Sequence, residues 1–219
     1  MIRYLGKPLE IAVEDEVEFV LNGRVYRKFC TPSMLKELAI GFLVSEGILK
    51  SPDDLKLEIS GKRILAEIPD ISEFELNSRF SGFSENFRPK IRSKRRFKLE
   101  ELKKHLQILE IEEYRKTRGY HVSAIVTGDS FYRAYDVGRH NAVDKAIGMA
   151  LLNSVDLSNS FLLISGRISK EIALKCVNAG IPLLVSKAAI LSSAIEFCME
   201  SGLSAVSFAT NIAVGDAIE

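Results

Sequence analysis

Apolar and polar residues follow one pattern in the first half of the chain and another in the second. In the first half, residues 11–21 alternate as a strand does, Asn22-Gly23 is a strong turn signal, and residues 25–30 return as a second strand. Two more short strands, joined by a Ser60-Gly61 turn, are expected between residues 51 and 70. This half is therefore predicted to contain a small sheet.

A helix is predicted directly after the hairpin. Thr31 can serve as its N-cap, and Pro32 suits the first helical position. Gly47 is typical of the left-handed residue that ends a helix. Between them, apolar residues recur at helical spacing and form a core-facing stripe: Leu35, Leu38, Ala39, Phe42 and Leu43.

From residue 121 onward, apolar strands alternate with amphipathic helices. Strands are expected at 121–127, 131–137, 161–165, 181–186 and 203–208. Helices are expected at about 140–153, 169–179 and 189–201, the last two capped by Gly180 and Gly202, and one more helix is expected before this region, at about 99–111. Strands that are apolar throughout require a sheet covered on both faces. We therefore predict a smaller α+β domain over residues 1–110 and an α/β domain over residues 111–219.

Composition narrows the class of protein. The 219 residues are 47% hydrophobic and 27% charged, which is ordinary for a soluble globular protein. The net charge of +1 provides no overall electrostatic attraction to nucleic acid or to a membrane surface. No apolar stretch approaches the roughly 18–20 residues that span a bilayer. The first eight residues lack the apolar run of a signal peptide. We therefore expect a cytoplasmic protein that binds neither nucleic acid nor membrane.

The segment from residue 77 to residue 98 has no clear period. It is polar and contains glycine at first, and between Arg88 and Lys98 it has seven basic residues and no acidic one. We predict a mobile or irregular loop here. It could be a flap over an anionic ligand, a docking surface for an acidic partner, or simply a solvated loop.

Three strand-to-helix turns in the second half each place a small residue beside a cation. They are Gly138-Arg139-His140, Ser165-Gly166-Arg167 and Ser186-Lys187. If the preceding strands are parallel neighbours, the three turns open on one sheet edge, where helix N-termini favour anions. Around the first turn, Asp136 could pair locally with Arg139, and His140 or Asn141 could cap the next helix. This edge is predicted to bind a ligand with phosphates.

The remaining candidate groups are a histidine and three cysteines. His121 stands at a strand start, where a structural role is common, and it joins the site only if its strand lies beside the helix that His140 opens. Cys176 and Cys198 fall on apolar helix stripes and are expected to be inert core thiols. Cys30 precedes the expected helix N-terminus, where the dipole could favour a thiolate, but the favoured interpretation is the last residue of a strand. The cysteine spacing indicates neither a disulfide framework nor a zinc site.

Several of these segments together resemble the formate dehydrogenase accessory proteins of the FdhD/NarQ family. The segment from Thr31 to Ile48 (TPSMLKELAIGFLVSEGI) follows that family's T-P-x-x-L-x-E-L-A-x-G-F-L-x-S-E-G-I signature, and Asp136 to Lys145 (DVGRHNAVDK) its D-V-G-R-H-N-A-x-D-K block. Further matches are Thr117-x-Gly-x-His121, Ser165-Gly-Arg167 and Ala179-Gly-Ile-Pro182. These matches occur in order over most of the chain.

The resemblance implies a cytidine-deaminase-like, three-layer α/β/α domain at the C-terminal end, without the deaminase zinc signature. It also implies a homodimer and a sulfur carrier. Such a carrier takes sulfur from a cysteine desulfurase, as a persulfide, and passes it to the molybdenum bis-guanine-dinucleotide pterin cofactor before formate dehydrogenase receives that cofactor. The expected cofactor-binding residues are His121, Asp136, Gly138, Arg139, His140, Asn141, Ser165, Gly166, Arg167, Ser186, Lys187 and Phe208. No metal ligand is expected.

Two departures from the family pattern bear on the chemistry. The family's C-G-x-C-G loop reads RFSGFSENFR over residues 79–88 and has neither cysteine, so Cys30 is the only candidate thiol left. The C-terminal G-F-x-x-x-G-R segment retains only Phe208. The alternative hypothesis is therefore a non-catalytic cofactor chaperone or adaptor, and a weaker one is a hydrolase with His121 or His140 as general base.

Overall fold

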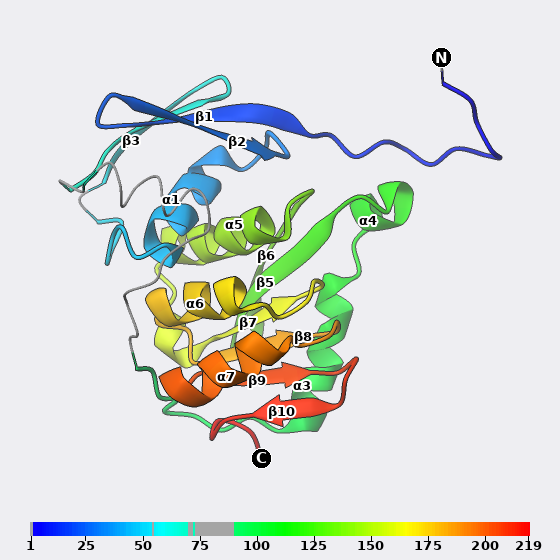
Figure 1. The fold of residues 1–219 in the computed structure, drawn as a ribbon, viewed down its shortest axis with the longest axis vertical. Helices are drawn as coiled ribbons and strands as arrows, with labels where there is room; N and C mark the ends of the chain where they lie inside the picture. Colours follow the sequence, from blue (N-terminus) through cyan, green and yellow to red (C-terminus); the bar gives the residue numbers. More distant parts are fainter. Residues whose placement is uncertain (1, 54, 70–71, 73–89) are drawn as a thin grey trace.

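The computed structural model describes residues 2–53, 55–69, 72 and 90–219. It contains two sheets (Figure 1), a four-stranded one in the order β2-β1-β4-β3 and a six-stranded one in the order β10-β9-β8-β7-β5-β6. The mixed α/β class expected from the sequence is confirmed. Among the described residues, no helix combines the length and the apolar character that crossing a membrane requires.

The first sheet is built on the predicted hairpin. Its strands are β1 (Asp15–Leu21), β2 (Arg24–Cys30), β3 (Lys56–Ser60) and β4 (Arg63–Glu67). The hairpin turn needs positive φ at both central residues, and Asn22 (φ 49°) and Gly23 (φ 81°) supply it. Helix α1 (Leu35–Ser45) covers one face. There the Phe19 and Phe42 rings pack edge to face, with 5.4 Å between the ring centres.

Helix α1 begins later than predicted. Met34, in a left-handed conformation (φ 55°), precedes its first residue, and Thr31 is not its N-cap. Instead, the Thr31 backbone N–H donates to the Asp136 carboxylate and its hydroxyl accepts from the Val137 N–H. The sequence pattern could not show this, because both partners lie more than a hundred residues away. Gly47 has the positive φ (71°) expected after the helix.

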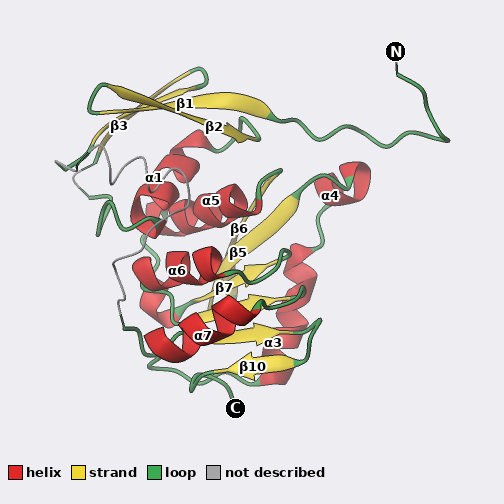
Figure 2. Ribbon diagram, viewed as in Figure 1, coloured by secondary structure: helices red, strands yellow, loops and turns green. Residues whose placement is uncertain are grey.

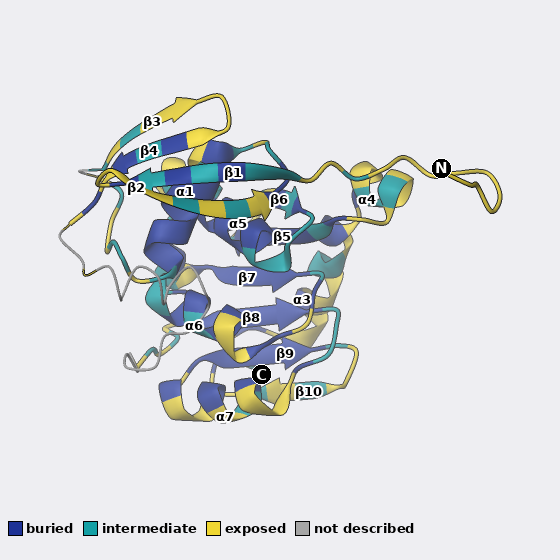
Figure 3. Ribbon diagram, turned by 45° about the horizontal axis from the view of Figure 1, so that its top comes forward, coloured by how far each residue is buried: buried dark blue, intermediate teal, exposed yellow. Residues whose placement is uncertain are grey.

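The second sheet is mixed, and two of its strands, one at an edge and one next to the other edge, run opposite to the rest. Its strands are β5 (His121–Thr127), β6 (Ser130–Asp136), β7 (Phe161–Ile164), β8 (Leu183–Ser186), β9 (Ser204–Ser207) and β10 (Ile212–Val214). Strand β5 is antiparallel to both β6 and β7, whereas β7, β8 and β9 are parallel. The central strands β7, β8 and β9 are buried along their whole length (Figure 3). Sequence reasoning missed β10, which has only three residues.

Helices cover both faces of the second sheet, which gives three layers (Figure 2). One face, the helix face, packs against α5 (Arg139–Leu152), α6 (Lys170–Asn178) and α7 (Ser192–Ser201). The other, the pocket face, packs against α3 (Leu99–His105) and the 3-10 turn η1 (Leu106–Leu109). The short elements α4 (Glu112–Thr117) and η2 (Leu157–Asn159) complete the secondary structure of the described residues. Alternate strand residues serve the two faces: Leu162 and Ile164 belong to the helix-face core, Phe161 and Leu163 to the pocket-face core.

The segment before β5 belongs with the second sheet. Phe97, Leu102 and Leu109 are buried in the pocket-face core, whereas the predicted boundary at residue 110 placed them in the smaller domain. Residues 77–89 of the predicted basic loop lie outside the described residues. In the remainder, Ile91 bonds to Ser201 at the end of α7 and the Phe97 ring meets that of Phe161, the first residue of β7. Residues 90–98 therefore lie at the opposite end of the sheet from the cationic turns, and a flap role for them is wrong.

The two units meet where α1 crosses α5. A Cβ added to Gly41 would lie 1.7 Å from the Asp144 carbonyl oxygen, and one added to Gly148 would lie 1.9 Å from that of Glu37. Both glycines are required, because the two backbones touch at the crossing. Helix α5 is consequently buried on two sides, by the second sheet and by α1.

Candidate functional site

The three cationic turns lie at one edge of the second sheet. Strands β6, β7 and β8 all end there, because the reversed strand β5 places β6 in the same direction as β7. The prediction assumed that the strands before the three turns are neighbours. In the structure they are not all neighbours, because β5 separates β6 from β7. Its first residue, His121, consequently stands at the same edge, paired with Asp136 across the ladder. The strand of His121 also packs against the helix that His140 opens, which was the condition for counting His121 among the site residues.

On the helix face of this edge, Gly166 lies between His121 and Arg139. A Cβ at position 166 would approach the His121 Nδ1 to 3.3 Å and the Arg139 Cβ to 3.5 Å, so a side chain there would crowd both groups. The Arg139 Nε is buried and has no hydrogen-bond partner. A buried donor without a partner costs free energy, which a bound acceptor would recover. Arg167, in the same turn, is exposed.

The pKa of His121 is lowered, first by burial and then by the positive charge of Arg139. The Asp136 carboxylate opposes this shift, and Arg167 adds to it. The imidazole is therefore neutral at pH 7, where it can both donate and accept a hydrogen bond. The positive charges of two predicted site residues, Arg139 and Arg167, thus both act on a third, His121.

His140 is the second residue of α5 and is largely enclosed. Burial lowers its pKa to about 4, with further contributions from the charges of Lys175 and Arg139. The pKa of the nearby Glu171 carboxylate is lowered, first by the Ser169 hydroxyl and also by the charge of Arg139. A histidine that is neutral at pH 7 adds no positive charge to the edge, so Arg139 and Arg167 supply the charge on this face.

Lys187 extends to the pocket face instead. Its Nζ lies 3.0 Å from Oε1 of Glu110 and 5.8 Å from the centre of the Tyr114 ring, which the Arg118 guanidinium also approaches, at 5.3 Å. Lys187, Tyr114 and Arg118 belong to a pocket of about 230 Å³, and Glu110 is not part of its lining. The pocket is lined by Leu109, Tyr114, Arg118, Gly119, Tyr120, His121, Val122, Ser165 and Lys187. The pocket combines an aromatic wall with two cations.

The other predicted residues at the edge hold the turns together. Ser165 accepts a hydrogen bond from the Val122 N–H at 2.9 Å, and Ser186 donates to the Gly166 carbonyl at 2.6 Å. Phe208 packs against the pocket-face core, and its N–H donates to the Ser186 carbonyl. These contacts fix the distances between neighbouring strand ends, and so the positions of the cations.

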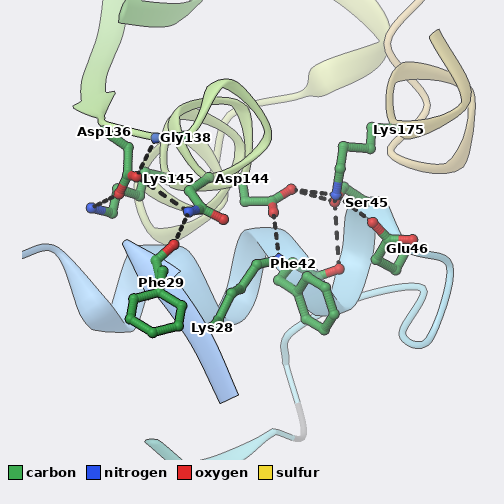
Figure 4. A network of polar contacts seen from close by, with 11 residues as sticks. Lys28, Phe29, Phe42, Ser45, Glu46, Asp136, Gly138, Asp144, Lys145 and Lys175 are labelled. Atoms are coloured by element: carbon green, nitrogen blue, oxygen red, sulfur yellow. Dashed lines mark hydrogen bonds and ion pairs between the residues drawn. The ribbon is translucent and has the colours of Figure 1, made fainter. Parts of the chain in front are cut away.

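Asp136 and Asn141, by contrast, lie in a buried network that joins the two units. Figure 4 shows Asp136 together with Gly138 and Lys145. The Asp136 carboxylate accepts hydrogen bonds from the Gly138 N–H at 2.8 Å and from Lys145 Nζ at 2.5 Å. Asn141 donates to Asp136 and to the Phe29 carbonyl, at the end of the first sheet. Asp136 pairs with Lys145, not locally with Arg139 as the sequence allowed. Their contacts give both Asp136 and Asn141 a structural role.

A second buried set of charges lies further along the same crossing (Figure 4). The Lys175 ammonium is 2.8 Å from Asp144 and 2.5 Å from Glu46, and it also donates to the Ser45 hydroxyl. Burial lowers the pKa of Lys175, but the two carboxylates outweigh it, so the pKa is raised. Lys28 approaches the second oxygen of Asp144 at 4.0 Å. These charges tie α1, α5 and α6 together.

None of the three cysteines is accessible. Cys30, Cys176 and Cys198 are free thiols with at most 1% of their surface exposed. Burial raises the pKa of Cys30 to about 11, and the nearby Asp136 carboxylate adds to the shift. The expectation that a helix dipole could favour a Cys30 thiolate is wrong, because α1 begins five residues later. The core positions expected for Cys176 and Cys198 are confirmed.

Sequence reasoning missed two residues that line the pocket, Tyr114 and Arg118, and Glu110, which pairs with Lys187. Tyr114, Arg118 and Glu110 lie in a segment that was interpreted only as a helix followed by a glutamate cluster. Arg118 lies inside the Thr117-x-Gly-x-His121 match, and this position was the one available signal. No group of three or more potential metal ligands occurs among the described histidine, cysteine and acidic residues.

Comparison with known proteins gives consistent results. The chain is 34% identical to the sulfur carrier protein FdhD of Methanothermobacter thermautotrophicus, over 92% of this chain and 86% of that protein. It is 30% identical to protein FdhD of Methanocaldococcus jannaschii, over 92% and 85%. Its fold is similar to the crystal structure of a candidate formate dehydrogenase accessory protein from Desulfotalea psychrophila, with a TM-score of 0.75, 24% identity and coverage of 90% and 84%.

The family assignment is based on most of the chain. The sequence profile of the FdhD/NarQ family matches residues 12–214, which include both sheets and every cationic turn. The match therefore includes the joint between the two units as well as the sheet edge. On this match and on the identity to its relatives, the chain belongs to the FdhD/NarQ family.

Proposed function

We propose that this protein acts in formate dehydrogenase maturation by binding the guanine-nucleotide-bearing pterin cofactor at the cationic sheet edge. The observation that carries the proposal is the gathering of Arg139, Arg167 and Lys187 at one edge, from three separate turns. Guanidinium and ammonium groups bind phosphate through charge-assisted hydrogen bonds. The pyrophosphates of such a cofactor match this set of donors.

The edge residues have distinct parts in this proposal. Arg139 and Arg167 would hold phosphate oxygens, and the neutral His121 would donate or accept one hydrogen bond between them. Gly138 and Gly166 would let the ligand approach the backbone closely. The Tyr114 ring offers a face on which a planar base could stack.

Sulfur transfer is the second candidate function, favoured by the naming of relatives as sulfur carrier proteins. A persulfide carrier needs an accessible thiolate. Here the three cysteines are buried, and the pKa of Cys30 is raised to about 11. We therefore favour a cofactor-binding chaperone or adaptor over a carrier that holds sulfur on its own cysteine.

A binding experiment tests the first function. Titration calorimetry with GDP should give measurable affinity for the unaltered protein, weaker affinity for Arg167→Ala, and unchanged affinity for Cys30→Ala. Lys56→Ala is the matched control, because Lys56 is also an exposed cation but lies in the first sheet. Absence of GDP binding, or equal losses in Arg167→Ala and Lys56→Ala, would contradict cofactor binding at this edge.

A labelling experiment separates the two candidates. The protein is incubated with a cysteine desulfurase and ³⁵S-cysteine, and its persulfides are counted by mass spectrometry. We expect no label on any cysteine. Label on Cys30 that disappears in Cys30→Ala would instead establish the sulfur carrier function. Ligand retained by the purified protein, identified in the same instrument, would define the cofactor.

The remaining expectations concern partners and location. We propose a cytoplasmic homodimer that delivers the cofactor to formate dehydrogenase, with a cysteine desulfurase as a further partner if sulfur is carried. Light scattering coupled to size-exclusion chromatography measures the oligomeric state directly. Co-purification with formate dehydrogenase from cells that make both proteins tests the client.

A further inference from the structure

The segment that leads into α3, residues 90–98, is here named the basic strip because it carries six cations. They are all exposed: Lys90, Arg92, Lys94, Arg95, Arg96 and Lys98. None of the six forms an ion pair with a described residue. The basic strip passes the end of α7 (Figure 1) and lies at the opposite end of the second sheet from the cationic turns. The proposed function therefore does not use these charges.

The backbone of the basic strip is held at both ends. The Ile91 N–H donates to the Ser201 carbonyl at 2.8 Å, and the Phe97 N–H donates to the Ala217 carbonyl at 2.8 Å. Gly202 makes room for the first contact, because a Cβ at that position would lie 2.4 Å from the Ile91 carbonyl oxygen. An anchored backbone loses less conformational freedom when a partner binds than a free loop does.

A turn and an aromatic contact hold the middle of the strip. The Ser93 hydroxyl donates to the Arg95 carbonyl at 2.6 Å and accepts from the Arg95 N–H at 3.2 Å. The Arg95 guanidinium lies 5.0 Å from the centre of the Phe97 ring, which is buried. Arginines supply three of the six charges, and a guanidinium can form two parallel hydrogen bonds with one carboxylate. The strip is therefore suited to binding carboxylates.

Exposed apolar side chains flank the strip at both ends. Met199 is 70% exposed and lies two residues before Ser201, which anchors the start of the strip. Leu99 is 40% exposed and directly follows the last cation. Methionine and arginine are both enriched where proteins meet one another, and methionine adapts to partners of different shape. Charge and apolar contact area thus occur together on this surface.

Carboxylates beside the strip favour a protein partner over a continuous polyanion. Glu100, Glu101 and Glu200 are exposed and adjoin the two apolar residues. A nucleic acid or an anionic membrane would bring further negative charge onto these glutamates, whereas a protein can place other groups opposite them. Phe97 is the one aromatic residue of the strip, and its burial leaves no ring there on which a base could stack.

We propose that the basic strip, together with Met199 and Leu99, is a docking surface for an acidic protein segment that carries apolar residues among its carboxylates. The three arginines bind the carboxylates of that segment, and the two apolar residues contact its apolar side chains. A partner docked here leaves the cationic edge open at the other end of the sheet. The inference goes beyond the proposed function, and either can fail without the other.

Fluorescence anisotropy with labelled peptides tests the docking surface on the full chain. One probe is decaglutamate, and the other has two leucines between two runs of five glutamates. We expect both to bind, the leucine peptide at least about threefold more tightly. The triple variant Arg92→Gln, Arg95→Gln and Arg96→Gln should bind both peptides at least about tenfold more weakly. Met199→Gln with Leu99→Gln should remove only the advantage of the leucine peptide.

A matched control and a folding check accompany these variants. Arg27→Gln, Lys36→Gln and Arg63→Gln together remove the same charge from exposed positions of the first sheet and α1, and should change neither affinity. Thermal unfolding shows whether each variant is folded. If the triple variant does not fold, Arg92→Gln with Arg96→Gln provides the test, because it keeps the contact between Arg95 and Phe97.

The contrary outcomes are distinct. Absence of binding by both peptides, or equal losses in the strip variant and the control, would overturn the docking surface. Equal affinities for the two peptides would overturn the part assigned to Met199 and Leu99. Decauridylate, or vesicles containing phosphatidylserine, could instead bind more tightly than the peptides and lose affinity in the strip variant. That result would assign the strip to nucleic acid or to membrane and overturn the acidic protein partner.

Discussion

The Nζ atom of Lys145 lies 2.5 Å from Oδ2 of Asp136, and neither side chain has exposed surface. The same ammonium donates to the Thr31 carbonyl at 2.8 Å, while the Thr31 N–H donates to the Asp136 carboxylate at 3.1 Å. A strand end of the second sheet, helix α5 and the segment that leads into α1 therefore share one closed set of hydrogen bonds. These hydrogen bonds hold the two units together next to the first cationic turn.

Replacing Lys145 by methionine should strongly destabilise the protein. Methionine leaves the Asp136 carboxylate buried without its cation, and breaking a buried pair in this way costs about 3–5 kcal/mol. The free energy of unfolding in urea measures the loss. Lys56→Met, which removes an exposed ion pair with Glu67, should change the free energy of unfolding little, because solvent screens that pair. Equal effects of the two changes would contradict the structural role of Lys145.

Adding one methyl group at the helix crossing should also be costly. In Gly148→Ala the new Cβ would lie 1.9 Å from the Glu37 carbonyl oxygen, so the helices α1 and α5 must move apart. Overpacking of this kind costs about 1–3 kcal/mol or more, measurable as a lower melting temperature. Gly6→Ala is the control, since its Cβ would meet nothing within 4 Å. An unchanged melting temperature for Gly148→Ala would show that the helices cross differently.

Much of the fold could be predicted because its elements are encoded locally. The hairpin at Asn22-Gly23 and the apolar strands of the second sheet follow from turn chemistry and periodicity alone. The start of α1 could not be predicted, because Thr31 bonds to Asp136, which the folded chain brings from far away in the sequence. The position of β5 between β6 and β7 could not be predicted either, because a sequence pattern does not give the order of strands in a sheet.

The candidate site shows the same division. The small residues and cations of the turns are visible in the sequence, and the shared edge follows once strand directions are known. The structural role of Asp136 is not visible, because an acidic residue at a strand end looks the same whether it faces solvent or a buried lysine. Arg118 and Tyr114 were missed because they belong to or follow α4, a short polar helix with no motif of its own. Only the folded structure shows that these two residues line the pocket at the strand ends.

The buried Cys30 thiol should make stability fall at alkaline pH. Its pKa is raised from 9.0 to about 11 in the folded protein, so folding favours the protonated form. The stabilisation is fully present below pH 9 and is lost between about pH 9 and 11, by roughly 2–3 kcal/mol. Unfolding free energies across this range should fall less steeply in Cys30→Ala. Identical slopes would contradict the pKa shift.

Because the thiol is buried, dithionitrobenzoate should also react with it only after unfolding.

His140 should make stability fall at acidic pH, for the opposite reason. Its pKa is lowered from 6.5 to about 4, first by burial and then by the charge of Lys175, so folding favours the neutral imidazole. The stabilisation is present above pH 6.5 and is lost as the pH falls toward 4, by about 3 kcal/mol. Unfolding free energies between pH 7 and 4 should therefore fall less steeply in His140→Gln, which keeps a neutral polar side chain. An NMR titration of the His140 ring protons locates its pKa independently. A His140 imidazole that titrates near its ordinary pKa of 6.5 would refute this explanation of the acid sensitivity.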